Sequence, residues 1–216
     1  MPRLFAALYD HIGAGYERTV MRPRRHELLR EAHGTVVELG AGTGANLDLY
    51  PDDVEVLLTE PDPHMRRRLQ ARAADHRGVQ VLDAAAEALP LDDATVDTVV
   101  ATLVLCSVGD PSRALAAVHR VLRPGGRLLF LEHVRSPEPR IARWQDRLVP
   151  VTSRVAGNCH PNRDTVAAVR DAGFRISHLV EHGGDALTER LQPVVQGVAI
   201  RTSTSPASGQ PAPARA

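Results

Sequence analysis

The sequence predicts a single α/β domain built on a doubly wound, mostly parallel sheet of seven strands. Strand-like and helix-like runs alternate over residues 35–201. The run Val96–Thr102 is almost continuously apolar, as in a strand that helices cover on both faces. A chain of 216 residues that is 43% hydrophobic and 24% charged can bury one core of this size.

The two ends of the chain differ from this middle zone. Residues 1–33 are predicted to form an N-terminal helical lid, and residues 34–201 the main domain. Apolar side chains recur at helical spacing in the lid, at Leu4, Phe5, Leu8, Ile12, Leu28 and Leu29. Residues 202–216 are rich in Ser, Pro and Ala without apolar periodicity, which predicts a disordered tail.

The predicted strands are short β-branched or apolar runs bounded by turn residues. They are Thr35–Leu39, Val54–Thr59, Val79–Leu82, Val96–Thr102, Gly126–Glu132, Phe174–Val180 and Val194–Arg201. Helices are predicted between them over Pro63–Asp75, Pro111–Leu122 and Asn162–Ala172. Asp110 is a suitable N-cap for the second helix, and Gly173 is a suitable residue after the third.

Composition excludes several classes of function. Lys+Arg and Asp+Glu both number 26, so the neutral balance gives no reason to expect nucleic acid as a partner. The chain contains no lysine, which excludes Schiff-base and Walker-A chemistry. Two cysteines do not make a secreted disulfide scaffold, and no histidine pair has zinc-finger or HExxH spacing, so no metal is expected. No segment reaches the ~18 apolar residues of a membrane span, and we expect a cytoplasmic protein.

The motif that carries most information is the glycine loop Glu38-Leu-Gly40-Ala-Gly42-Thr-Gly44-Ala45-Asn46, which follows the first strand. We expect it to open a helix and to present backbone N–H groups to a ligand. Its glycines also fit the dinucleotide fingerprint, and a glycine turn without a ligand is a third interpretation.

Two acids bear on the choice of ligand: Glu60 suits both kinds of cofactor, and Glu38 distinguishes between them. Glu60 ends the second predicted strand, where a carboxylate accepts hydrogen bonds from the two ribose hydroxyls of either kind of cofactor. Glu38 precedes the glycines, where it would order the loop or pair with a cationic ligand and would repel a pyrophosphate. The loop therefore favours S-adenosylmethionine, which is cationic at its sulfonium and amine, over a dinucleotide.

These motifs, together with Leu122-Arg-Pro124-Gly125-Gly126 before the fifth strand, resemble the class I S-adenosylmethionine-dependent methyltransferases. Further strings, Thr102–Val108, Glu132–Val134, Trp144-Gln145 and Gly157-Asn-Cys159, are similar to the methyltransferase-like 7 group, which methylates alkyl thiols. The chain is more loosely similar to ubiquinone/menaquinone C-methyltransferases and to phospholipid N-methyltransferases. The resemblance implies a Rossmann-like class I fold and methylation of a small-molecule acceptor, with S-adenosylhomocysteine as the second product.

The resemblance also implies a set of cofactor-binding residues. It places Gly40, Gly42 and Gly44 at the methionine half, Glu60 at the ribose, and Pro61 and Met65 at the adenine, although Met65 also fits a core position of its helix. Ala85 stands where the family's motif has the Asp that usually meets the adenine amine, so we expect backbone groups around Ala86 to take that role, with Glu87 near them as a structural or binding residue. The remaining expected cofactor residues are Glu38, Thr102, Leu103 and Tyr16.

The acceptor pocket is expected at the carboxyl ends of the fourth and fifth strands. His133 is the candidate general base, because its unperturbed pKa lies near ~6.5, although it would equally serve as a hydrogen-bonding loop residue. Cys106 is a pocket residue that packs as an apolar side chain more readily than it acts as a nucleophile. Residues 135–160 form a substrate-side insert in which Trp144 is expected to pack over the pocket. Cys159 and His160 would face the substrate or cap the next helix.

The leading hypothesis is therefore S-methylation of a small thiol or sulfide by in-line displacement. C- or O-methylation of a quinone-type or natural-product acceptor and phospholipid N-methylation are the alternatives within the same class. A NAD-dependent oxidoreductase is the alternative from another class, and a non-catalytic cofactor-binding scaffold is the third.

Overall fold

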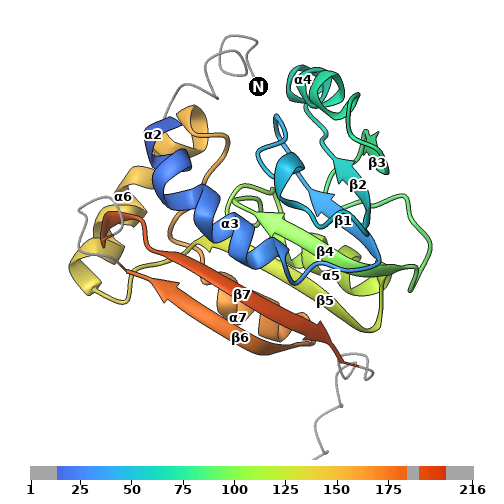
Figure 1. The fold of residues 1–216 in the computed structure, drawn as a ribbon. Helices are drawn as coiled ribbons and strands as arrows, with labels where there is room; N and C mark the ends of the chain where they lie inside the picture. The colour runs from blue at the N-terminus through green and yellow to red at the C-terminus, as the bar shows by residue number, and fades with distance from the viewer. Residues whose placement is uncertain (1–13, 184–189, 203–216) are drawn as a thin grey trace, which may run out of the picture.

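The computed structural model describes residues 14–183 and 190–202 and is built around one seven-stranded sheet (Figure 1). The strand order is β3-β2-β1-β4-β5-β7-β6. Strands β1 to β5 pair in parallel, and β7 runs antiparallel to both of its neighbours. The strands are β1 (Thr35–Leu39), β2 (Glu55–Thr59), β3 (Val79–Leu82), β4 (Val96–Thr102), β5 (Leu122–His133), β6 (Phe174–His182) and β7 (Val194–Arg201). The predicted doubly wound, mostly parallel sheet of seven strands is confirmed.

Helices cover both faces of the sheet and divide the core in two. Helices α3 (Arg22–Leu29) and α4 (Pro63–Ala73) pack on one face, where Leu28, Leu29 and Leu69 are buried in one apolar cluster. Helices α5 (Pro111–Val121) and α7 (Thr165–Asp171) pack on the other face. Because β4 lies between the two layers, its apolar residues are buried throughout, as the predicted continuous run requires.

The described part of the predicted lid is one helical stretch with a π-helical turn inside it. It consists of α2 (Ala14–Tyr16), the π-helix η1 (Glu17–Met21) and α3. Pro23 lies in the first turn of α3 and has no N–H to bond to the preceding turn. The wider π turn before it accommodates the proline ring without ending the helix. Residues 1–13, which include the predicted apolar positions Leu4 to Ile12, lie outside the described residues, as do residues 203–216 of the predicted tail.

Aspartate caps start three of the helices. The side chains of Asp62 and Asp110 accept hydrogen bonds from backbone N–H groups in the first turns of α4 and α5. Helix α7 begins at Thr165, three residues later than the predicted Asn162, because the Asp164 carboxylate caps it by accepting from Ala167 N at 2.9 Å. Gly173 follows this helix with φ of 88°, as predicted for the residue after the C-cap.

The glycine loop does not open an α-helix, contrary to the expectation from the sequence. It continues through turns into the 3₁₀ helix η2 (Leu47–Leu49), and the chain is extended at Tyr50. Pro51 disfavours helical geometry at the residue before it, and few residues separate Gly44 from that proline. A short 3₁₀ turn is therefore the longest helix that this connection holds.

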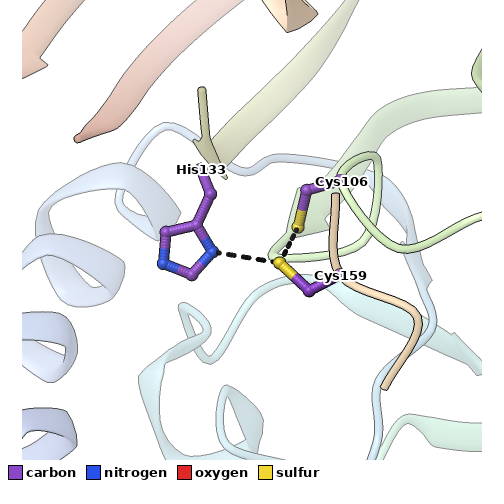
Figure 2. A group of neighbouring side chains, drawn as sticks. All are labelled: Cys106, His133 and Cys159. Atoms are coloured by element: carbon purple, nitrogen blue, oxygen red, sulfur yellow. Dashed lines mark hydrogen bonds between the residues drawn. The ribbon is translucent and has the colours of Figure 1, made fainter. Parts of the chain in front are cut away.

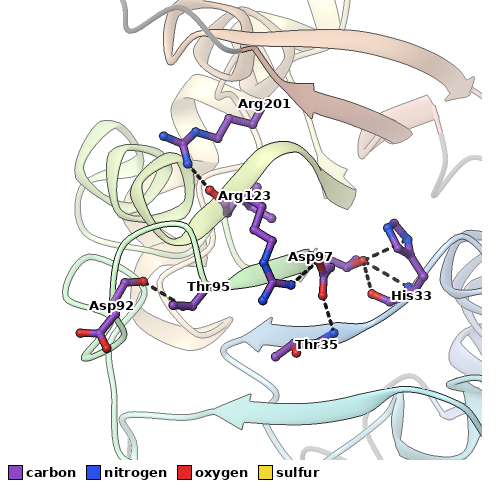
Figure 3. Close-up of polar contacts among 9 residues, drawn as sticks. His33, Thr35, Asp92, Thr95, Asp97, Arg123 and Arg201 are labelled. Carbon is purple, nitrogen blue, oxygen red and sulfur yellow. Dashed lines mark hydrogen bonds and ion pairs between the residues drawn. The ribbon is translucent and has the colours of Figure 1, made fainter.

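The string from Leu122 to Gly126 forms a bulge at the start of β5. Its pairing with β4 jumps from Val96↔Leu122 to Thr98↔Arg127, so the intervening residues loop out of the ladder. Asp97 anchors this bulge, since its carboxylate pairs with Arg123 and accepts from Thr35 N at 2.9 Å (Figure 3). Arg201 also contacts this bulge, because its guanidinium donates to the carbonyl of Leu122.

Helix α6 (Pro139–Val155) is held against the sheet by one buried amide. Gln145 accepts from Ser136 N at 2.9 Å and donates to the carbonyls of Val134 and Pro161 at 3.1 Å each. The predicted insert 135–160 is thus mostly one helix, tied at its middle to the chain before and after it. Among the described residues, no helix combines the length and the apolar character needed to cross a membrane.

Candidate active site

A cavity of about 580 Å³ runs along the carboxyl edge of the sheet, from β2 across to β5. Its volume lies within the range of small-molecule sites, and this edge is where open α/β sheets bind ligands. One end is lined by residues after β1, β2 and β3, and the other by the loops after β4, β5 and α6. The lining residues are Gly40, Gly42, Glu60, Pro61, Met65, Ala86, Glu87, Leu103, Val104, Cys106, Ser107, Val108, Gly109, His133, Thr152, Val155, Ala156, Gly157, Cys159 and Gln192.

Two glycines of the loop expose their backbone to the cavity. Gly42 has φ of 60°, and a Cβ built on it would meet no protein atom within 4 Å. The left-handed backbone favours glycine at this position, and the lack of a neighbouring atom leaves the backbone open toward the cavity. Gly40, with φ of 51°, lies so close to Val104 that a Cβ would come within 3.1 Å of its side chain.

Glu60 connects this loop to the end of β2. Its Oε2 accepts from Gly42 N at 2.9 Å and its Oε1 accepts from Asp62 N at 2.8 Å. The side chain is buried yet lines the cavity, and burial raises the pKa of Glu60 against the opposing effect of these two hydrogen bonds. Each carboxylate oxygen keeps a second acceptor site, so the group can hold the loop and accept ligand hydroxyls at once.

Glu38 holds the loop through buried hydrogen bonds and does not line the cavity. It is 2% exposed and accepts from Asn46 Nδ2 at 2.9 Å and from the hydroxyl of Tyr50 at 2.5 Å. Burial raises the pKa of Glu38, and these two hydrogen bonds together with the charge of Arg25 oppose that rise. Of the two roles considered from the sequence, ordering the loop is the one that the contacts support, and direct pairing with a ligand is not.

The residues that the resemblance places at the adenine come from three segments of the chain and reach one cavity. Pro61, Met65 and Ala86 all line the cavity, and Met65 is also buried against its own helix. Glu87 lines the cavity too, while its Oε1 accepts from Gly109 N at 2.9 Å and from Asp110 N at 3.3 Å. Glu87 therefore fixes the loop before α5, which agrees with the structural role considered for it.

The loop after β4 is held by a carboxylate from β5. Glu132 is fully buried, and its side chain accepts from the N–H groups of Val104, Leu105 and Cys106 at 2.8, 2.9 and 3.1 Å. Burial raises the pKa of Glu132 although these three bonds oppose the rise. Leu103 begins this loop with φ of 60°, a strained conformation for leucine that concentrates at functional sites.

Two cysteines and a histidine meet at the other end of the cavity (Figure 2). The Sγ atoms of Cys106 and Cys159 are 3.8 Å apart, and the Sγ of Cys159 is 3.7 Å from Nδ1 of His133. The hydrogen bond with Cys159 and burial raise the pKa of Cys106 to about 12. Both cysteines are free thiols.

Besides Glu38, five residues predicted for the site lie outside the cavity lining. A Cβ on Gly44 would meet Leu47 at 2.5 Å, so that glycine serves packing, and the Thr102 hydroxyl is used by Arg25 and Asn46 at 2.6 and 3.0 Å. Tyr16 packs against the core under α3. Trp144 is 39% exposed because Gln145, its neighbour in α6, faces inward. The side chain of His160 does not line the cavity, and its backbone N–H donates to the carbonyl of Cys106.

The sequence analysis missed the end of α6 and the loop that follows it. Thr152, Val155, Ala156 and Gly157 line the cavity, and Val155 is 62% exposed at its mouth. The apolar periodicity of that helix was a signal for Val155 alone. Gln192 also lines the cavity, and no sequence signal indicated it.

The residues present fit S-adenosylmethionine. Gly42 leaves the loop backbone open to the cavity, and the buried Glu60 carboxylate faces the same space with acceptor sites to spare. Pro61, Met65 and Ala86 add the apolar surface that an adenine ring needs. The loop opens no α-helix, whereas the pyrophosphate of a dinucleotide sits at the N-terminus of such a helix.

Comparison with known proteins agrees with this geometry. Residues 37–130 match the model of the methyltransferase domain family. Thiol S-methyltransferase TMT1B of Homo sapiens is 36% identical over 167 residues, which are 71% of this chain and 68% of that protein. The chain belongs to the S-adenosylmethionine-dependent methyltransferases. TMT1B of Rattus norvegicus is 39% identical over 145 residues, 65% of this chain, and the chain spans 59% of that protein's length.

One further sequence relative and one solved structure of similar fold can be compared with this methyltransferase. The ubiquinone/menaquinone biosynthesis C-methyltransferase UbiE of Acidiphilium cryptum is 33% identical over 178 residues, which cover 71% of this chain and 72% of that protein. The crystal structure of a putative methyltransferase from Bacillus halodurans shares the fold, with a TM-score of 0.68 over 84% of this chain and 99% of that chain, at 13% identity. The family, fold and cofactor class expected from the sequence are confirmed, and the oxidoreductase alternative finds no support.

Proposed function

We propose that the protein transfers the methyl group of S-adenosylmethionine to the sulfur of a small thiol and releases S-adenosylhomocysteine. The observation that carries this proposal is a continuous cavity that joins the Gly42–Glu60 cradle to the Cys106–His133–Cys159 end. The relatives named thiol S-methyltransferases, at 36–39% identity, support a thiol as the acceptor.

The chain's own residues would bind and orient the two reactants. Gly40 and Gly42 offer backbone to the methionine half, and Glu60 accepts the ribose hydroxyls. Pro61, Met65 and Ala86 flank the adenine. When bound, the cofactor supplies a methyl group on a cationic sulfur. Because the cradle and the sulfur-lined end share one cavity, an acceptor thiol bound at the far end would share that space with the methyl group, and in-line alignment of the two would be worth up to ~7–11 kcal/mol, as in well-oriented reactions.

A thiol needs little help at this site. Its pKa lies near ~8.5, so a few per cent is thiolate at neutral pH, whereas a hydroxyl or carbon acceptor requires a well-placed base. His133 lines the acceptor end and is assigned the role of favouring the thiolate form of the acceptor. Val104, Val108 and Val155 line the same cavity with apolar surface, which admits a lipophilic thiol and excludes water from the reacting sulfur.

Release of S-adenosylhomocysteine from purified protein tests the choice of acceptor. Panels of alkyl thiols, hydroxyl and quinol compounds, and phosphatidylethanolamine vesicles would be supplied with the same cofactor. We expect turnover with alkyl thiols and faster turnover as the alkyl chain lengthens. Turnover with the quinol panel or the phospholipid but with no thiol would overturn the proposed acceptor and leave the family assignment intact.

A further inference from the structure

Three metal-ligating side chains from three different segments of the chain converge at the acceptor end of the cavity. Cys106 follows β4, His133 ends β5 and Cys159 follows α6, so they are 26 to 53 residues apart in the chain. Their Sγ and ring nitrogen atoms all lie within 4.8 Å of one another (Figure 2). Sequence spacing gave no reason to expect a metal, because ligand motifs that are read from a sequence have much shorter spacings.

Two of the three distances in this cluster match the ligand shell of a tetrahedral zinc ion, and the third, between Cys106 Sγ and the His133 ring, is within 4.8 Å. Zn–S bonds of ~2.3 Å at tetrahedral angles place two sulfurs about 3.8 Å apart, and a Zn–N bond of ~2.0–2.1 Å places the nitrogen about 3.6 Å from a sulfur. The observed Sγ–Sγ and Sγ–Nδ1 distances are 3.8 and 3.7 Å. A disulfide requires an S–S distance near ~2.05 Å, which is much shorter than the separation observed.

Hydrogen bonds fix the loops that carry these ligands. Three backbone N–H groups of the Cys106 loop donate to Glu132, as described above. The Cys159 loop is joined to the Cys106 loop by His160 N, which donates to Cys106 O at 2.7 Å, and by Arg163 Nη1, which donates to Leu105 O at 2.6 Å. Asn158 Nδ2 adds a bond to Ser107 O at 2.7 Å. The cluster is therefore preorganised by partners outside it, as metal sites generally are.

The cluster is also open on one side. All three residues line the cavity, so a cation held by them would keep its fourth position toward the space where the acceptor binds. Three protein ligands and one open position are the pattern of catalytic zinc sites, whereas structural sites close with four. Two cysteines and one histidine are one of the known ligand sets of such sites.

We propose that Cys106, His133 and Cys159 bind a thiophilic divalent cation, best matched by Zn²⁺, whose open position takes the sulfur of the acceptor thiol. This inference rests on the proposed thiol acceptor and names the way in which His133 favours its thiolate. When the cation binds, the two cysteine thiols each lose a proton to water. When the acceptor binds, a Zn–S bond forms and its S–H bond breaks, and the proton leaves to water at the cavity mouth.

Methyl transfer then proceeds with all atoms and electrons accounted for. A lone pair of the acceptor sulfur forms the new S–C bond, and the bonding pair of the old S–C bond returns to the sulfur of the leaving S-adenosylhomocysteine. The product thioether is neutral and is a weaker ligand than a thiolate, so it leaves the cation open for the next acceptor. No oxidant or reductant is needed.

Cobalt titration of the full chain tests this site independently of catalysis. Reduced protein, stripped with a chelator, would be titrated with Co²⁺ and followed by its thiolate-to-cobalt charge-transfer absorption, and then with Zn²⁺ as competitor. We expect one equivalent to bind and Zn²⁺ to displace it. Cys106→Ser and Cys159→Ser should weaken binding by at least about a hundredfold, since even ligand-supporting residues contribute ~10–100-fold. His178→Ala, which removes an exposed imidazole on β6 outside the cavity lining, is the matched control and should bind cobalt normally.

S-adenosylmethionine binding by calorimetry, at the opposite end of the cavity, shows whether each variant is folded. Absence of the charge-transfer absorption in folded wild-type protein would overturn the inference, as would unchanged cobalt affinity in Cys159→Ser. Isolation of a Cys106–Cys159 disulfide, with no metal uptake after its reduction, would overturn it too. Thiol methylation that persists at full rate in metal-free protein would overturn the metal's role and leave the proposed function standing. Cobalt binding without methylation of any thiol would overturn the proposed function and leave the metal site standing.

Discussion

Replacing Glu60 with Gln removes a charge and one acceptor atom from the cradle that joins the glycine loop to β2. Both carboxylate oxygens face backbone N–H groups, from Gly42 at 2.9 Å and Asp62 at 2.8 Å. An amide has one oxygen and one NH₂ group, so one of these N–H donors will face another donor in either orientation. We therefore expect the variant to unfold more easily by about 1–3 kcal/mol, even without cofactor.

We also expect Glu60→Gln to weaken cofactor binding, in addition to lowering the stability of the fold. Hydrogen bonds to a charged acceptor are worth about 1.5–3 kcal/mol, so losing the carboxylate should weaken S-adenosylmethionine binding by roughly 10- to 150-fold. Calorimetric titration measures the affinity, and urea unfolding measures the stability. Asp83→Asn is the control, because Asp83 is an exposed carboxylate that pairs with Arg66 beside the same strand end. Its affinity should change by less than about twofold. A Glu60→Gln protein that binds the cofactor as tightly as wild type would refute the assignment of Glu60 to the ribose.

Three further predictions concern stability. Gln145→Leu leaves the buried Ser136 N–H and two carbonyls without their partner and should lower the free energy of unfolding by about 2–4 kcal/mol, measured in urea; an unchanged value would mean that α6 is held by other contacts. Gly197→Ala places a Cβ 2.4 Å from the ring of Phe130, so a loss of about 1–3 kcal/mol is expected, and a stable variant would show that the ring moves freely. Partial burial raises the pKa of Asp97, but its hydrogen bonds with Arg123 and Thr35 N outweigh this effect and lower the pKa. The contribution of Asp97 to stability is therefore present above the unfolded pKa of ~3.9 and is lost as the pH falls through the lower folded pKa. Unfolding measured from pH 7 to pH 3 should thus be less acid-sensitive in Asp97→Asn, and parallel curves would contradict this.

Local patterns in the sequence were enough to predict the sheet and the cofactor cradle. Strands β1, β3, β4 and β7 begin and end where the apolar runs do, and Glu60 and Gly42 were identified from their spacing after strands. These features depend on neighbouring residues and on the rule that parallel strands end at one edge.

The acceptor end depends on contacts between distant parts of the chain and was less predictable. Trp144 and Gln145 are neighbours in α6, and nothing local indicates that the amide turns inward and the indole outward. The amide faces inward because it bonds to backbone groups of two segments, before and after the helix, whose positions are known only from the fold. Likewise, Cys106 and Cys159 were predicted separately as pocket residues, and their approach to 3.8 Å follows from the packing of two loops that are 53 residues apart.

The most direct test of the account follows the methyl group itself. Purified protein would be incubated with an alkyl thiol and with S-adenosylmethionine carrying a trideuterated methyl group, and the products would be identified by mass spectrometry. We predict a thioether in which one trideuteromethyl group has replaced the sulfur-bound hydrogen, formed in equal amount with S-adenosylhomocysteine and suppressed in Glu60→Gln. Recovery of the unlabelled thiol alone, from protein that binds the cofactor, would contradict the claim that this cavity brings a thiol to the methyl group.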